Sequence, residues 1–363
     1  MKKSLIALAV ISATGSAFAQ SSVSIYGILD GGYNQVTTTT ATGDVKVRAS
    51  GGNAAGAWAS NRLGFRGTED LGGGTTANFV YELGLNAGTD GALTTSAARL
   101  SHISLANKDL GEVKVGRQYN PIFLTSASLD AGRANNVAFG RVLYGQIATT
   151  RSSGGINYTS PNFNGFVVNA IVGQNETDST TLLGVTTTAA DSNSVMGGSI
   201  SYTLGDLNLQ AAVHQTNLKN PAATATTAAT AGDKDETLFG GTYTMGNIKA
   251  LAMFGSTKVK NSVGAQFAKR EGYQLGLQAS LNGAYNTPGS IDLFATYGSA
   301  DVQAGSSAAE KTTKGTQVGG MYNLSKRTGV YAAYGKTTGT LTGAGTLFAS
   351  EGNELAVGVR HSF

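Results

Sequence analysis

The feature that most constrains this chain is a regular alternation of long polar segments with tight turns. Seven short stretches rich in Gly, Asn, Asp and Pro indicate turns, at 69–74, 107–111, 160–165, 204–206, 245–247, 282–289 and 323–327. Eight longer polar segments separate them, at about 37–55, 87–97, 119–150, 173–194, 216–235, 259–270, 300–312 and 338–352. These fifteen connections imply sixteen strands. An even number of strands, with long loops at one end and short turns at the other, predicts an all-β, antiparallel transmembrane β-barrel.

Residues between these connections alternate in polarity with a period of two. In "SNRLGFRG", Leu63 and Phe65 point one way, whereas Arg62 and Arg66 point the other way. The first and last segments, 23–34 and 355–363, alternate in the same manner. We therefore expect the two terminal strands to pair and close the barrel, with both arginines on its water-filled side.

Composition favours a barrel over a large exported globule. Charged residues make up 13% of the chain, about half of the usual quarter, and glycine accounts for 51 of 363 residues. No stretch after the N-terminus approaches the roughly 18 apolar residues of a membrane helix. Cysteine is absent, so the fold uses no disulfide.

The N-terminus is typical of a cleavable secretory signal. Lys2 and Lys3 precede an apolar stretch at 5–11, and Ala17-Phe18-Ala19 precedes Gln20. We expect a signal peptide at 1–19 and a mature barrel at 20–363. Without the two lysines the chain has 24 basic and 22 acidic residues, a balance that argues against a nucleic-acid partner.

The third and longest loop, 119–150, which we call loop three, is the one we expect to narrow the channel. A barrel of sixteen strands is too wide for its own side chains to fill. This loop carries more apolar side chains than a solvated loop needs: Ile122, Phe123, Leu124, Leu129, Phe139 and Leu143. We therefore predict that it folds into the lumen and packs against the inner wall.

Six stretches, in order along the chain, resemble the general porins of the Gram-negative outer membrane. They are "SSVSIYGILDGGYN", "SNRLGFRGTEDLGGG", "GEVKVGRQYNP", "INYTSPNFNGF", "NLSKRTGVYAAYG" and the final "GVRHSF". The resemblance implies a homotrimer of sixteen-stranded barrels with loop three folded inward. It also implies lipid and lipopolysaccharide as surroundings, delivery by the barrel assembly machinery, and small hydrophilic solutes and inorganic anions as cargo.

The family sets basic residues on the wall opposite loop three. Carried over by motif, these are Arg62 in "SNRLGF", Arg117 in "VGRQY" and Arg151 in "TTRSSGGINY"; Arg66 shares a face with Arg62. By alternation Arg117 lies on the face of the valines two and four residues before it, so its lumen position requires a bulge after Gly116. These arginines could also brace loop three through hydrogen bonds.

The acidic side of the family pattern is weak in this chain. Loop three lacks a "PEFGG"-like motif and offers Asp130 alone, against Arg133 and Arg141. Asp30 and Glu82 are candidate counter-charges on the wall. We therefore predict a net positive constriction with a weak preference for anions.

Other functions fit the sequence less well. His102, His214 and His361 are the only imidazoles, and neither a Gly-x-Ser-x-Gly motif nor a metal-spaced cluster is present. We expect no enzyme activity, no cofactor and no metal. A substrate-specific anion channel of the same fold, in which Tyr26, Tyr119 and Tyr144 could form an aromatic path, and a barrel-anchored surface adhesin remain alternatives.

The last residue, Phe363, ends an alternating strand. A C-terminal aromatic residue at this place resembles the signal that the outer-membrane assembly machinery recognises. It also suits the aromatic girdle of a barrel, and the two roles are compatible.

Overall fold

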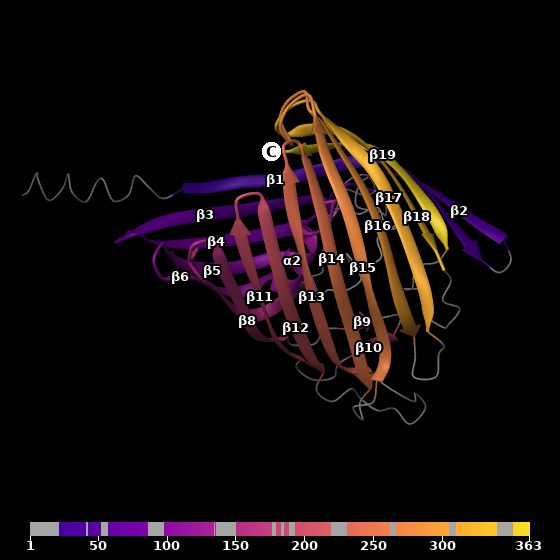
Figure 1. Ribbon diagram of the computed structural model, residues 1–363. Coiled ribbons are helices and arrows are strands. Elements are labelled where there is room, and N and C mark those ends of the chain that lie inside the picture. The colour runs from indigo at the N-terminus through magenta and orange to yellow at the C-terminus, as the bar shows by residue number, and fades with distance from the viewer. Residues whose placement is uncertain are drawn as a thin grey trace, which may run out of the picture.

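The computed structural model describes residues 22–40, 43–51, 57–85, 98–133, 135, 150–175, 179–182, 185–188, 193–218, 231–261, 266–304, 310–339 and 351–363. Within these residues, sixteen antiparallel strands form one closed barrel (Figure 1). They are β1 (Ser22–Thr40), β3 (Arg62–Gly72), β4 (Thr75–Gly84), β5 (Leu100–Asn107), β6 (Gly111–Tyr119), β7 (Arg151–Thr159), β8 (Phe166–Asn175), β11 (Asn193–Leu204), β12 (Leu207–Leu218), β13 (Ala231–Met245), β14 (Ile248–Asn261), β15 (Gln266–Leu281), β16 (Ile291–Ala304), β17 (Lys311–Asn323), β18 (Thr328–Thr338) and β19 (Gly352–Ser362). The predicted fold class is confirmed.

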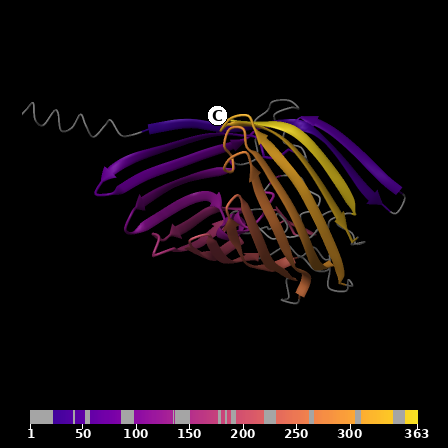
Figure 2. The ribbon, with the colours of Figure 1, turned by 45° about the horizontal axis from the view of Figure 1, so that its top comes forward.

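The barrel closes between its first and last strands. β1 pairs with β19 from Ile28↔Ser362 to Thr38↔Gly352, and Figure 2 shows these strands side by side in indigo and yellow. The backbone of Phe363 extends the seam, because it exchanges two hydrogen bonds with Gly27, each 3.1 Å long. Closure leaves neither terminal strand with an unpaired edge.

The predicted connections also match the structure. Each of the seven tight turns joins a strand to its neighbour: β3 to β4, β5 to β6, β7 to β8, β11 to β12, β13 to β14, β15 to β16 and β17 to β18. Glycines with positive φ hold several of these turns, for example Gly205 and Gly246. The long segments join the opposite ends of the strands.

Two predicted loops contain strands of their own. β2 (Gly43–Gly51) pairs with residues 32–40 of β1, whereas residues 22–28 of β1 pair with β3. β9 (Ser179–Leu182) and β10 (Val185–Thr188) form a separate two-stranded ribbon. Threonine makes up most of the β9–β10 ribbon, and β2 contains Val45 and Val47. Such β-branched residues favour extended pairing even in a segment that a turn count assigns to a loop.

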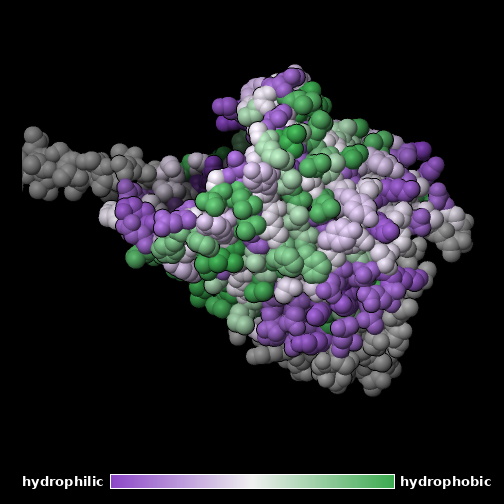
Figure 3. Space-filling view, in the orientation of Figure 1, coloured by the Kyte–Doolittle hydropathy of each residue, from purple (hydrophilic) through white to green (hydrophobic). Residues whose placement is uncertain are grey.

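Alternation along the strands separates an apolar exterior from a polar interior. Ile103, Phe239 and Leu277 are more than half exposed and point outward, as do many other large apolar side chains. Figure 3 shows apolar side chains over the middle of the strands and hydrophilic ones toward the strand ends. None of the described helices has the length and apolar character needed to cross a membrane.

The helix α2 (Pro121–Ser128) lies inside the barrel (Figure 1). It begins at Pro121, whose fixed φ and missing N–H suit a first helical position. It follows β6 along the chain and contacts β8, β11, β12 and β13.

Candidate pore constriction

Loop three is tied to the inner wall by glutamine side chains. Gln274 Nε2 donates to Asp130 Oδ1 over 2.7 Å, and Gln278 Nε2 donates to the Ala131 carbonyl over 2.9 Å. Their neighbours Leu275 and Leu277 point outward, so both glutamines face the lumen. Asn135 Nδ2 donates to Gln317 Oε1 over 2.9 Å, farther round the barrel, so the described part of the loop follows the inner wall.

Apolar contacts complete this attachment. Ile122 and Leu129 are 0% and 1% exposed, whereas Leu124 remains 51% exposed. A Cβ on Gly276 would lie 2.5 Å from the Ala131 methyl group, so glycine allows the loop to approach β15 closely. Phe139, Leu143 and Arg141 lie outside the described residues.

Three arginines gather around one tyrosine at the level of loop three. Arg99 Nη2 and Arg151 Nη2 donate to the hydroxyl of Tyr119 over 3.0 and 3.2 Å. The Arg151 guanidinium also lies 4.7 Å from the centre of the Tyr119 ring. Arg62 donates through Nε to the Ser60 carbonyl over 3.0 Å, which fixes the direction of its guanidinium.

In the part of the chain that the structure describes, one carboxylate partly neutralises the charge of these arginines. Glu82 is 3% exposed; its Oε1 lies 2.7 Å from Arg99 Nε and 3.9 Å from Arg62 Nη1, and its Oε2 accepts from Tyr26 over 3.1 Å. Three guanidiniums against one carboxylate leave the cluster with a net positive charge. We call Arg62, Arg99 and Arg151 the arginine cluster.

The arginine cluster lines a cavity of about 650 Å³ inside the barrel. The cavity runs past Phe123 of α2, which stacks on Tyr119 with ring centres 5.1 Å apart, toward the turns that follow β15 and β17. Within the described part of the chain, its charged lining consists of Arg62, Arg99, Arg133, Arg151, Lys326, Arg327, Arg360 and a single carboxylate, Asp292. The passage is therefore strongly electropositive along its length.

The segment that precedes β3, residues 57–61, also folds into the lumen. Asp30, 1% exposed on β1, accepts the Ala59 N–H over 2.8 Å and the Tyr331 hydroxyl over 2.6 Å. Tyr331 in turn accepts the Trp58 N–H over 3.2 Å. The Trp58 ring packs against Phe294 and Tyr331 at 5.5 and 5.4 Å between centres. This arrangement places residues 58–60 in the cavity wall next to Arg62.

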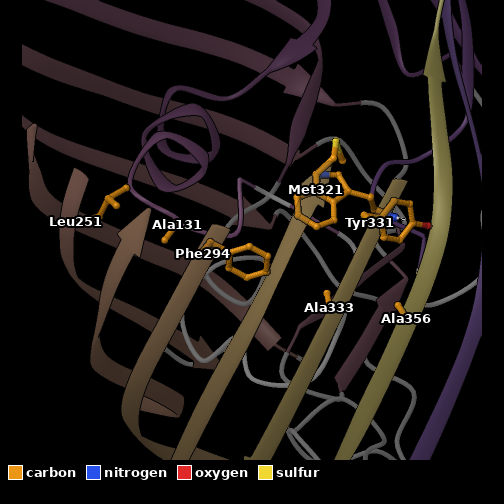
Figure 4. Close-up of a cluster of buried hydrophobic side chains, with 8 residues drawn as sticks. Ala131, Leu251, Phe294, Met321, Tyr331, Ala333 and Ala356 are labelled. Carbon is orange, nitrogen blue, oxygen red and sulfur yellow. Dashed lines mark hydrogen bonds between the residues drawn. The ribbon is translucent and has the colours of Figure 1, made fainter. Parts of the chain in front are cut away.

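Successive strands of the wall supply the apolar support for this segment. Figure 4 shows Phe294, Met321 and Tyr331 on neighbouring strands, with their side chains turned toward the lumen. Ala333 and Ala356 lie beside them and leave room for the indole. An apolar patch on the inside of a polar barrel thus serves to hold an inserted loop.

Apart from Arg117, the residues selected from the sequence for the constriction fall into three groups. Arg62, Arg133 and Arg151 line the cavity. Arg66 lies on the same face of β3 as Arg62; it is exposed, 5.2 Å above the Tyr26 ring, and does not line the cavity. Asp30 and Asp130 are each 1% exposed, and both act as hydrogen-bond acceptors that anchor loops to the wall.

Arg117 lies apart from the arginine cluster. The pairing of β6 with β7 is irregular between Gly116 and Gln118, where a bulge was expected. On the other side, however, Arg117 pairs in register with Ser101, which pairs with the outward-pointing Tyr81. The register therefore puts Arg117 on the outward face, where its Nη1 donates to Ser153 Oγ over 2.6 Å.

No pattern in the sequence indicates Arg99 as a residue of the constriction. It follows the predicted loop 87–97 and belongs to none of the motifs. Strict alternation of side chains along the strand, counted from the lumen-facing Ser104, would place the Arg99 side chain on the outside of the barrel. Its N–H donates to the Glu82 carbonyl at the start of β5, where the chain bends, and this bend turns its side chain inward.

The described residues contain no group of three or more His, Cys, Asp or Glu side chains that could hold a metal ion.

Comparisons with known proteins agree with this architecture. A family model described as "Gram-negative porin" matches residues 5–341. Outer membrane porin protein 32 of Delftia acidovorans is 34% identical over the full length of both chains. The anion-selective porin from Comamonas acidovorans superposes with a TM-score of 0.72 at 28% identity, covering 95% of this chain and 100% of its own. A trimer form of OmpT from Vibrio cholerae has a TM-score of 0.66 over 94% and 99% of the two chains; at 15% identity it supports the fold alone. A closed sixteen-stranded barrel with an inserted third loop, matched by a family model and by full-length relatives, identifies this chain as a member of the Gram-negative porin family of the outer membrane.

Proposed function

We propose that this porin is a passive diffusion channel for ions and small hydrophilic solutes, and that it prefers anions. The observation that carries the proposal is the arginine cluster, which faces the cavity beside loop three and has Glu82 as its one close carboxylate among the described residues. The channel needs no chemical step, cofactor or energy source. Its selectivity follows from the energy of a charge in a narrow, water-filled passage.

Charge at the narrowest level has the largest effect on permeation. At about 5 Å from one uncompensated guanidinium, an anion is stabilised by about 1 to 3 kcal/mol for effective dielectric constants of about 80 to 20. A cation meets a barrier of the same size. Rings of arginine accordingly favour anions in pores.

Loop three supplies the confinement that this electrostatic effect requires. α2 and the residues after it occupy the lumen against the wall of β12, β13 and β15. Without this insertion, ions would pass farther from the arginines and be screened within about 8 Å at physiological ionic strength. The anion selectivity attributed to the Comamonas acidovorans porin, at 28% identity, supports the same direction of preference.

We further propose a homotrimer as the functional unit, surrounded by outer-membrane lipid and lipopolysaccharide after delivery by the barrel assembly machinery. The proposed oligomeric state rests on the membership of this chain in the Gram-negative porin family. The signal peptide at 1–19 remains a prediction, because it lies outside the described residues.

The test is the reversal potential of the refolded mature protein in a planar bilayer under a KCl gradient. The wild type should give a reversal potential whose sign shows preferential permeation of chloride, and its conductance should close in groups of three equal steps, one for each protomer. Exchanging both Arg62 and Arg151 for glutamine should lower the anion-to-cation permeability ratio at least about fivefold. Arg48→Gln is the matched control, because Arg48 is exposed on β2 and donates to Gln35. An unchanged ratio in the double variant would refute the role of the cluster.

A further inference from the structure

The cavity does not end at the arginine cluster. Below it, toward the turns after β15 and β17, a second group of cations lines the same passage: Arg133, Arg360, Lys326 and Arg327. Arg133 belongs to loop three, Arg360 to β19, and the other two to the turn between β17 and β18. Three separate parts of the chain therefore bring positive charge to one place, which we call the vestibule.

Arg133 is held by the backbone and by an aromatic ring. Its φ of 54° lies in the left-handed region, which is uncommon for a residue with a side chain. Its N–H donates to the Asp130 carbonyl over 3.0 Å, and its guanidinium lies 4.4 Å from the centre of the Tyr285 ring. Asp130 is itself fixed by Gln274, so loop three presents Arg133 to the vestibule in a defined position.

Tyr285 brings a hydroxyl group to the same place. It lies in the turn between β15 and β16, lines the cavity, and interacts with Arg133 through its hydroxyl. Burial raises the pKa of this phenol above its ordinary value, although the neighbouring Arg133 and Arg360 oppose that shift. The hydroxyl therefore stays protonated at neutral pH. When Arg133 donates to its oxygen, its own proton is left to donate into the cavity.

Arg360 faces the vestibule without a dedicated carboxylate partner among the described residues. It pairs in register with Asp30, whose side chain faces the lumen, and interacts electrostatically with Asp30, Arg133 and Arg62. Both Asp30 oxygens, however, accept from Tyr331 and Ala59. The Nε of Arg360 has no hydrogen-bond partner in the part of the chain that the structure describes.

The one carboxylate in the lining is already fully engaged. Asp292 accepts from the side chains of Ser280, Ser290 and Asn323, and from the Asn286 N–H, at 2.7 to 3.3 Å. It holds the turn after β15 to the wall and is not part of an ion pair with a vestibule cation among the described residues. The vestibule therefore has guanidiniums and a hydroxyl for an anion, and no carboxylate among the described residues forms an ion pair with them.

We propose that the vestibule is a second anion-binding site, formed by Arg133, Tyr285 and Arg360, that takes small divalent oxyanions such as sulfate or a short dicarboxylate. The planar forks of two arginines match oxyanion geometry better than a spherical halide, and two negative charges answer two guanidiniums. Lys326 and Arg327 at the turn end raise the local anion concentration. An anion that leaves the arginine cluster would enter this second binding site before it reaches the end of the channel near the turns after β15 and β17. A divalent oxyanion bound there would obstruct the passage of chloride.

This inference rests on the proposed channel function, and the experiment separates the two. Chloride current through the refolded porin in KCl is titrated with sulfate and, in a second series, with succinate. In the wild type both anions should reduce the current. Arg133→Gln and Arg360→Gln should each raise the half-blocking concentration about tenfold, because each removes a charge-assisted hydrogen bond. An effect on sulfate alone would restrict the site to inorganic oxyanions, and an effect on succinate alone would restrict it to carboxylates.

Two further variants distinguish the loss of the binding site from a general loss of folding. Tyr285→Phe removes only a hydroxyl from a turn and should raise the half-blocking concentration several-fold. Lys249→Gln is the control: Lys249 faces the lumen opposite Gln278 but does not line the cavity, so block should be unchanged. If chloride current flows but block is the same in wild type, Arg133→Gln, Arg360→Gln and Tyr285→Phe, the vestibule site is refuted and the channel stands. If the wild type carries no anion-selective current, the proposed function itself fails.

Discussion

Tyr119 shows how a single phenol orders charge in a channel wall. Its oxygen accepts from Arg99 and Arg151, while its ring stacks on Phe123 and lies below the Arg151 guanidinium. Like charges at this spacing repel, and a neutral acceptor keeps them close without cancelling them. The cluster therefore retains its positive field, which a second carboxylate would have weakened.

At the same scale, Asp30 acts through the loop that it holds. Replacing it by asparagine leaves one acceptor oxygen for two donors, so the segment around Trp58 should loosen from the wall at a cost of about 1.5 to 3 kcal/mol. Trp58 is the only tryptophan and is 7% exposed, so its emission should shift to longer wavelength and become accessible to acrylamide. Asp44→Asn, which affects an exposed contact with Thr39 on the β1–β2 hairpin, should leave the emission unchanged. If the emission of the Asp30 variant equals that of the wild type, Asp30 does not position the segment.

Among the elements, loop three depends on the absence of a side chain in the wall. Glutamines of β15 and β17 bind its backbone and side chains, and Gly276 lets Ala131 approach β15. A Cβ on Gly240 of β13 would likewise lie 2.9 Å from Leu129 Cδ1, so a second glycine makes room for the same loop. The position of the constriction is therefore set by a local gap in the lining as well as by hydrogen bonds.

This dependence gives a test with a rescue. Gly276→Ala would place two methyl carbons 2.5 Å apart, well inside the usual contact distance of about 3.5 to 4.0 Å. Loop three should move off the wall toward the axis, and single-channel conductance should fall. Adding Ala131→Gly removes the opposing methyl group and should restore conductance. Gly31→Ala, at a position with open space around it, should change nothing. Equal conductance in wild type and Gly276→Ala would show that the loop is not held at this point.

For the whole molecule, closure at one seam decides whether a barrel forms. Residues 28–38 of β1 and 352–362 of β19 lie more than 300 positions apart, so their pairing has a high entropic cost of chain closure. Phe363 stands at the end of this seam, and its ring covers Gly27, where any side chain would collide with it. The last residue thus contributes to the seam in addition to its predicted role as an assembly signal.

The two roles of Phe363 can be separated in cells and in vitro. Phe363→Ala should reduce heat-modifiable, folded porin in the outer membrane several-fold, whereas Phe239→Ala, which removes a 58% exposed outward aromatic residue, should not. Refolding of the same variants into liposomes lacks the assembly machinery. A defect in cells alone identifies a recognition signal, and a defect in both settings identifies the seam contact. Equal behaviour of the two variants in cells would leave Phe363 as an ordinary girdle residue.

The sequence by itself determined the barrel, its strand number, its turns and the lumen side of Arg62. These properties follow from local rules: the period of two, turn-forming residues and the spacing between them. Contacts between distant segments decided the rest. The bend before β5 turned Arg99 inward, the register with β5 kept Arg117 outward, and a hydrogen bond from Gln274 made Asp130 an anchor of loop three. Periodicity cannot register a bend, a pairing partner or a hydrogen bond made across the lumen, because each of these is fixed only when the sheet closes.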